Sequence, residues 1–146
     1  MAFKIYLAGK MSGIDIEESD TWRRLSTILI RDRAYTQGVK VNVVNPNNFY
    51  NPNTKGHKTE KEAMQFDLNH VSTSDLIMVN LKEVNTSVGT AMELLTAAQL
   101  NIPVIAFGTG EEYSETHPWI KECISRVESN MVDAIEYIRD YYFVQN

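Results

Sequence analysis

Short apolar runs alternate with helical patterns along the chain, and this alternation constrains the fold more than any other feature of the sequence. Two of the runs, residues 75–81 (DLIMVNL) and 102–107 (IPVIAF), are almost entirely apolar. Runs of this length are typical of strands that are buried on both faces of a parallel sheet. Further strands are predicted at residues 3–8, at 39–44 and, more briefly, at 124–127.

Helices are predicted between the strands. The first is predicted over residues 14–35 from apolar residues at helical spacing, namely Trp22, Leu25, Ile28 and Leu29. The remaining helices are expected over residues 60–74, 87–100, 115–123 and 130–142. Residues 45–59 are rich in Asn, Pro, Lys and Gly and are predicted to form a long exposed loop.

This order of elements indicates an α/β fold. We expect a flavodoxin-like doubly wound sheet of about five parallel strands in the order 2-1-3-4-5, with helices on both faces. Residues 1–146 are expected to form a single domain. Ligands bind such sheets beyond the carboxyl ends of the strands, near the switch point between the first and third strands. The site should therefore gather residues 9–13, Asn45, residues 80–89 and Gly108.

Charge and composition exclude several classes of function. The net charge is −5, which disfavours a nucleic-acid polymer as partner because its backbone attracts basic surfaces. Cys123 is the only cysteine, and His57, His70 and His117 lack the spacing of metal ligands, so no metal and no cofactor is predicted. The sequence shows neither a signal peptide nor a run long enough to span a membrane, and a cytoplasmic protein is expected.

The turn after the first predicted strand is a candidate binding segment. It consists of Gly9, Lys10, Met11, Ser12 and Gly13. Glycines let the backbone approach a ligand closely, and the N–H groups at a helix start favour an anion. This turn could bind a phosphate or a sugar, or it could be a plain connection from strand to helix.

A second candidate segment follows Asn80, at the end of the third predicted strand. Ser87, Gly89 and Thr90 lead into a helix that carries Glu93 within about two turns of its start. A carboxylate in that position is stabilised in its ionised form, as a nucleophile requires. The alternative is that Glu93 belongs to a solvated polar stripe of an amphipathic helix.

Two further residues could converge with Glu93. Asp67 lies late in the helix that leads into the third strand, and Tyr6 lies on the first strand. Two carboxylates about 5 Å apart are used in glycosidic chemistry with retention, and a tyrosine hydroxyl could orient one of them. Alternatively, Asp67 is a surface residue and Tyr6 belongs to the core.

Three stretches resemble the nucleoside 2-deoxyribosyltransferase family. They are residues 5–9 (IYLAG), the block from Phe66-Asp67-Leu68 to residues 75–79, and residues 88–104 with the element Gly-x-x-x-Glu. The resemblance implies an enzyme of nucleotide salvage in which Glu93 attacks C1′ of the sugar and forms a glycosyl ester. It also implies that Tyr6 positions Glu93 and that Asp67 helps to protonate the leaving base.

The resemblance implies small-molecule partners and an oligomer. The substrates would be a nucleoside or a nucleoside 5′-monophosphate and a free nucleobase. The protein would be a homo-oligomer, a dimer or higher, in which a neighbouring subunit completes the pocket. A second base attacking the sugar ester gives transfer, and water gives hydrolysis.

One departure from the family pattern leaves the reaction open. Transferases typically carry an aspartate six residues before the nucleophile, where this chain has Ser87. A serine there is similar to the related deoxynucleoside 5′-monophosphate N-glycosidases, and the turn at residues 9–13 resembles their phosphate-binding turn. A transferase is expected first and the monophosphate hydrolase second. A nucleotide sensor without catalytic activity, which would bind tightly but break no bond, is the alternative from another class.

Overall fold

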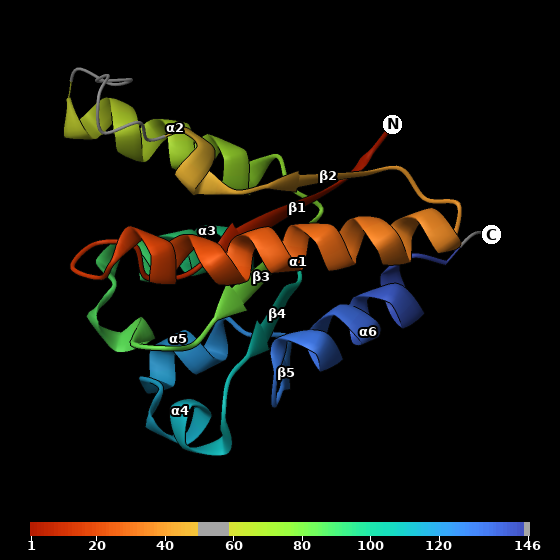
Figure 1. Cartoon of the computed structure of the whole chain (residues 1–146). Coiled ribbons are helices and arrows are strands. Elements are labelled where there is room, and N and C mark those ends of the chain that lie inside the picture. Colours follow the sequence, from red (N-terminus) through yellow and green to blue (C-terminus); the bar gives the residue numbers. More distant parts are fainter. Residues whose placement is uncertain (50–58, 145–146) are drawn as a thin grey trace.

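The fold is built on one sheet of five parallel strands, seen in a computed structural model that describes residues 1–49 and 59–144 (Figure 1). The strands are β1 (Phe3–Ala8), β2 (Val41–Val44), β3 (Leu76–Asn80), β4 (Val104–Phe107) and β5 (Arg126–Glu128). Their order is β2-β1-β3-β4-β5, and every neighbouring pair is parallel. This confirms the predicted flavodoxin-like sheet and its strand order.

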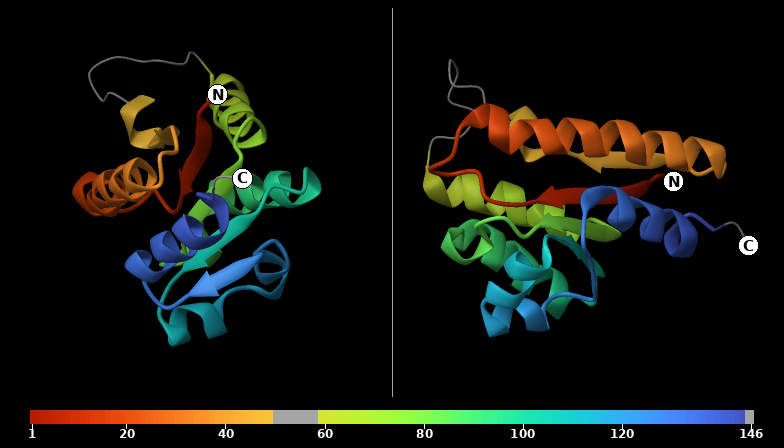
Figure 2. Two further views of the ribbon diagram at one scale, coloured as in Figure 1. Left: turned by 90° about the vertical axis from the view of Figure 1, so that its right-hand side faces the viewer. Right: turned by 60° about the horizontal axis from the view of Figure 1, so that its bottom comes forward.

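Helices cover both faces of the sheet. They are α1 (Ile16–Thr36), α2 (Glu60–Ser72), α3 (Val88–Gln99), α4 (Gly110–Glu115), α5 (Pro118–Glu122) and α6 (Met131–Tyr142). Figure 2 shows α1 and α6 on one side of the sheet and α2 and α3 on the other. The interior is accordingly divided into two apolar clusters, one on each side of the sheet.

The alternation of side chains along β1 decides which residues reach each face. Ile5 and Leu7 join the cluster under α1 and α6, whereas Tyr6 and Ala8 join the cluster under α2 and α3. Successive side chains of a strand point to opposite faces, so this pattern follows from the strand itself. It brings Tyr6 to the face that also carries α3.

Helix α1 is confirmed, but the spacing that predicted it marks its buried face only in part. Trp22 and Leu29 pack against the core, whereas Leu25 and Ile28 are 49% and 64% exposed. The buried residues of α1 are Ser19, Arg23, Ser26, Ile30 and Ala34. Three of these five are polar, so a count of apolar residues cannot identify this face.

The helix predicted over residues 115–123 is confirmed only over Pro118–Glu122. The segment contains the end of α4, a break at Thr116 and His117, and the separate short helix α5. Pro118 occupies the first position of α5, where its missing N–H is tolerated, and His117 before it is extended. The proline therefore begins a new helix instead of continuing the old one.

The segment predicted as a long loop begins with a 3₁₀ helix, η1 (Pro46–Phe49). Asn45 precedes it, and its side-chain oxygen accepts a hydrogen bond from the backbone N–H of Asn47 at 3.0 Å. Residues 50–58 of the predicted loop lie outside the described part of the chain. Within the described ranges, no helix combines the length and apolar character that crossing a membrane requires.

Candidate active site

Tyr6 and Glu93 form the centre of the candidate site. Glu93 points inward from α3 and is only 9% exposed, and Tyr6 on β1 is 1% exposed. The Tyr6 hydroxyl donates a hydrogen bond to Oε2 of Glu93. The contact joins residues 87 positions apart in the sequence. Burial of Glu93 contradicts the alternative in which it belongs to a solvated stripe.

The surroundings make Glu93 an unusual carboxyl group. Burial raises its pKa from 4.5 to about 7, and the negative charge of Asp67 adds to this rise. The hydrogen bond from Tyr6 and the positive charge of Arg23 oppose it. A carboxyl group whose pKa lies near neutral pH is partly ionised there, and its ionised form can attack carbon.

Asp67 lies on α2, which packs against α3, and is half-buried. Its charge acts on both members of the central pair. Burial raises the pKa of Tyr6 above its ordinary value, and the negative charges of Glu93 and Asp67 raise it further. The sequence-predicted set of Glu93, Asp67 and Tyr6 is thus brought together from α3, α2 and β1.

Ser87 lies directly before α3, where the predicted helix was expected to begin. Its Oγ lies 2.7 Å from Oγ1 of Thr90 and accepts the Thr90 N–H at 3.4 Å, which makes it the N-cap. The space beside Gly89 is open. The start of α3 therefore presents backbone N–H groups and a serine hydroxyl, with no carboxylate at the cap.

Lys10 lies beside this helix start. Its Nζ donates to Oγ1 of Thr86 at 2.8 Å and is 4.0 Å from Oε1 of Glu83. Lys10 and Asn80 also line a small pocket, whose other lining residues are Ile14, Glu18, Trp22, Lys82 and Glu83. The ammonium group of Lys10 therefore lies next to Thr86, the residue before the N-cap of α3.

The two glycines of the first turn are needed for different reasons. A Cβ on Gly9 would lie 3.0 Å from Cζ2 of Trp22 and 3.4 Å from Nη2 of Arg23, so packing of α1 requires this glycine. Gly13 has φ of +79°, which favours glycine. Between them, Met11 is half-buried and Ser12 is exposed. The structure gives packing and turn geometry as sufficient reasons for both glycines.

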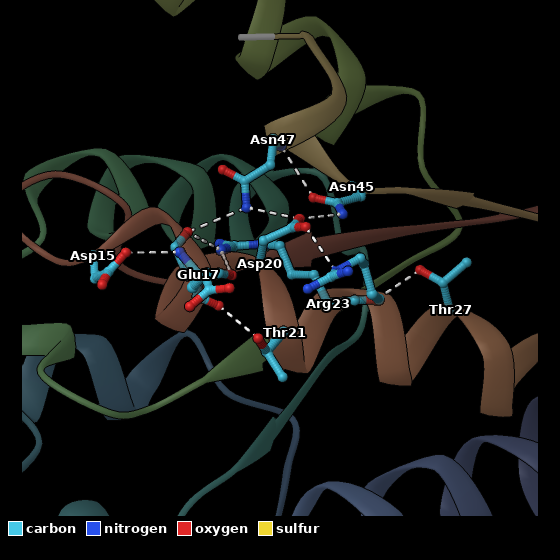
Figure 3. Close-up of polar contacts among 10 residues, drawn as sticks. Asp15, Glu17, Asp20, Thr21, Arg23, Thr27, Asn45 and Asn47 are labelled. Carbon is cyan, nitrogen blue, oxygen red and sulfur yellow. Dashed lines mark hydrogen bonds and ion pairs between the residues drawn. The ribbon is translucent and has the colours of Figure 1, made fainter. Parts of the chain in front are cut away.

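A polar cluster at the start of α1 was not predicted from the sequence. Oδ1 of Asp20 accepts hydrogen bonds from the side-chain amides of Asn45, at 2.9 Å, and Asn47, at 3.2 Å (Figure 3). Arg23 lies beside them and is fully buried. The spacing of Ser19, Arg23 and Ser26 by four and three residues was the available signal, because it marks one face of a helix.

The described residues offer no metal site. In residues 1–49 and 59–144, no group of three or more His, Cys, Asp or Glu side chains could hold a metal ion. What these ranges do bring together is a buried carboxyl group, a hydroxyl group bonded to it and a second carboxylate. Such a set can perform nucleophilic attack and proton transfer.

One protein family matches most of the chain. The model of the family described as nucleoside 2-deoxyribosyltransferase matches residues 5–133. This range includes Tyr6, Asp67 and Glu93. The search of curated proteins finds no match.

Solved structures share the fold at low sequence identity. A conserved protein from Enterococcus faecalis is similar with a TM-score of 0.75, 22% identity, and coverage of 96% of this chain and 99% of that one. A 2-deoxyribosyltransferase from Bacillus psychrosaccharolyticus is similar with a TM-score of 0.65 and 23% identity, and the match covers 92% of this chain and 91% of that one. The CMP N-glycosidase BcmB from Clostridium botulinum is similar with a TM-score of 0.57 and 14% identity, and the match covers 94% of this chain and 98% of that one.

Proposed function

The chain belongs to the nucleoside 2-deoxyribosyltransferase family, and we propose that it cleaves the N-glycosidic bond of a nucleoside or deoxynucleoside and transfers the sugar to another base. The observation that carries this proposal is the buried Glu93 carboxyl group, which accepts a hydrogen bond from Tyr6. The activity of deoxyribosyltransferase or N-glycosidase type follows from the family. The assignment of residues and substrate is our proposal.

The reaction proceeds in two displacements. An oxygen of Glu93 attacks C1′ of the sugar, the bond from C1′ to the base nitrogen breaks, and its electron pair stays on the base. Asp67 passes a proton to that base. A glycosyl ester of Glu93 remains, and Tyr6 holds the other carboxyl oxygen by its hydrogen bond.

The second displacement regenerates the enzyme. A nitrogen of another base attacks C1′, the ester bond breaks, and Glu93 leaves as a carboxylate while Asp67 takes the proton released by the incoming base. Attack by water would instead release the free sugar. Both displacements invert C1′, so the product keeps the configuration of the substrate.

Product analysis tests this proposal. The protein is incubated with deoxynucleosides and with their 5′-monophosphates, each with and without a free second base, and products are separated by chromatography. We expect a new nucleoside when the second base is present, and a loss of about 10³-fold or more in Glu93→Gln.

Matched controls make the result specific. Glu122→Gln removes an exposed carboxylate on α5 and should keep wild-type activity. Nucleotide binding without product under any condition, with wild type and Glu93→Gln alike, would favour the sensor alternative and reject the enzyme.

A second candidate function is hydrolysis of deoxynucleoside 5′-monophosphates. The observation that favours it is the start of α3, where Ser87 is the cap and Lys10 lies against Thr86. An aspartate at the cap would repel a phosphate, whereas a hydroxyl, backbone N–H groups and an ammonium group would bind it.

The substitution Ser87→Asp separates the two candidates. Aspartate caps a helix as well as serine does, so the stability of α3 should be retained. If the substrate carries a phosphate, kcat/KM for monophosphates should fall about 10-fold or more, while activity on nucleosides should be unchanged or higher. Equal activity of both proteins on monophosphates would remove the second candidate.

A further inference from the structure

Arg23 is a positive charge withdrawn from water that the proposed reaction does not use. It comes from α1 and has no exposed surface. Its guanidinium donates to the backbone oxygens of Leu7 at 3.2 Å and Gly9 at 3.0 Å. It also donates to the backbone oxygen of Ser19 at 2.7 Å and to its hydroxyl at 2.8 Å. The arginine therefore joins α1 to the carboxyl end of β1.

All four acceptors of Arg23 are neutral. Within residues 1–49 and 59–144, no carboxylate forms an ion pair with it. Asp20, one turn earlier, accepts hydrogen bonds from Asn45 and Asn47 and pairs with Arg24 at 2.9 Å (Figure 3). The buried charge is thus balanced only at longer range, and Asp20 is already shared.

Arg23 reaches the catalytic pair from the opposite face of the sheet. Its helix packs with α6, on the face of Leu7, whereas Tyr6 and α3 lie on the other face. Its hydrogen bonds to the oxygens of Leu7 and Gly9 enclose the end of the strand just after Tyr6. It can influence Glu93 through the strand and through its electric field, without contact with a substrate.

We propose that Arg23 is a positioning residue that fixes the end of β1, just after Tyr6, and supplies a positive charge that favours the ionised form of Glu93. As a role in catalysis this inference rests on the proposed function. As a property of Glu93 it can be measured in the resting protein. It gives a role to a fully buried arginine whose hydrogen bonds are accepted by neutral groups alone, although burying a charge is costly.

The titratable groups around Glu93 come from three elements. They are Tyr6 on β1, Asp67 on α2 and Arg23 on α1. Of the two that carry a charge, Asp67 and Arg23, only Arg23 favours the ionised carboxylate. Burial lowers the pKa of Arg23 to about 10, against the effect of the negative charges of Glu93 and Asp20. Arg23 therefore stays protonated at neutral pH and keeps its field.

Titration of the Glu93 carboxyl group tests the proposal without reference to activity. Protein labelled with ¹³C at the glutamate carboxyl carbons is titrated by NMR, and the Glu93 signal is assigned by its loss in Glu93→Gln. Arg23→Met removes the charge at similar length and should move the midpoint up by about one pH unit, a tenfold change in acidity. Arg23→Lys keeps the charge and should stay within about 0.5 unit of wild type.

Control variants distinguish an electrostatic effect of Arg23 on Glu93 from a purely structural one. Arg24→Met removes the neighbouring charge, whose side chain is 62% exposed, and should leave the Glu93 midpoint in place. An unchanged midpoint in folded Arg23→Met overturns the proposal. If that variant does not fold, Arg23→Lys decides, because a rise of a full unit despite the retained charge overturns it as well.

A failure of this proposal differs visibly from a failure of the proposed function. If the enzyme is active, the acid limb of its pH profile for kcat/KM should move with the NMR midpoint. If no activity is found, the midpoint still shows whether Arg23 acts on Glu93. Activity with an acid limb that does not respond to Arg23→Met would leave the reaction in place and reject the role of Arg23.

Discussion

The hydrogen bond from Tyr6 lowers the pKa of Glu93, whereas burial raises it. It favours the ionised carboxylate, whereas burial, the larger effect, favours the protonated form. Tyr6→Phe keeps the ring in the core and removes only the hydroxyl. The pKa of Glu93 should rise further, so activity near neutral pH should fall about 10-fold and recover in part at higher pH.

The pH profile of kcat/KM measures this change. The acid limb should move to higher pH in Tyr6→Phe, while Tyr35→Phe, at a position that is 85% exposed, should match wild type. An acid limb that stays in place would mean that the hydroxyl does not support the ionised carboxylate.

Burial of Glu93 also makes the free energy of unfolding depend on pH. Its folded pKa of about 7 lies above the ordinary 4.5, so the folded protein holds this proton more tightly than the unfolded chain. The resulting stability is fully present below about pH 4.5 and is lost as the pH rises to about 7. The loss is up to about 3 kcal/mol of unfolding free energy.

Glu93→Gln should therefore stabilise the protein in a pH-dependent way. Glutamine is neutral at every pH and can still accept the Tyr6 hydrogen bond. Urea unfolding should show a gain of about 1–3 kcal/mol at about pH 8 and little change at about pH 4.5. A gain that is equal at both pH values would show that ionisation of Glu93 is not its cause.

At the scale of elements, the sequence predicted the strands better than the buried faces of the helices. Apolar runs identify β3 and β4 directly, because a strand covered on both faces is nearly apolar throughout. The buried face of α1 could not be read in this way, since Ser19, Arg23 and Ser26 occupy it. Arg23 is hydrogen-bonded to Ser19 and to β1, and Ser26 donates to Sδ of Met131 on α6. Only tertiary structure provides the contacts with β1 and α6.

The candidate site was predictable in part for a similar reason. Glu93, Asp67 and Tyr6 could be predicted from the ends of elements and from the family resemblance. Arg23 could not be singled out, because its partners are mostly backbone oxygens, and those carry no signal in the sequence. Pro118 is itself a sequence signal of the break, because proline favours the first position of a helix.

The junction between β1 and α1 should be sensitive to a single methyl group. In Gly9→Ala the new Cβ would meet Trp22, whose ring packs edge to face against Phe107 at 5.5 Å, and would approach Arg23. We expect a loss of about 1–3 kcal/mol in thermal or urea unfolding. Gly110→Ala, where the added Cβ meets nothing within 4 Å, should be neutral or slightly stabilising. Equal stability of the two variants would contradict this reason for Gly9.

At the scale of the whole molecule, the strand order explains where the site lies. The order β2-β1-β3-β4-β5 reverses between β1 and β3, and the segments after these two strands carry Lys10 and Ser87. Glu93 comes from the helix after β3, and Tyr6 comes from β1 itself. Residues distant in sequence therefore meet at one edge of the sheet because of its topology.

The central claim is that the sugar becomes bonded to Glu93 during the reaction. Rapid quenching of enzyme with saturating nucleoside or monophosphate, followed by intact-mass and peptide mass spectrometry, tests it directly. The account predicts an added mass of one sugar residue on the peptide that contains Glu93, and no such peptide in Glu93→Gln. Turnover with the sugar bonded to another residue, or product of inverted configuration without any adduct, would contradict it.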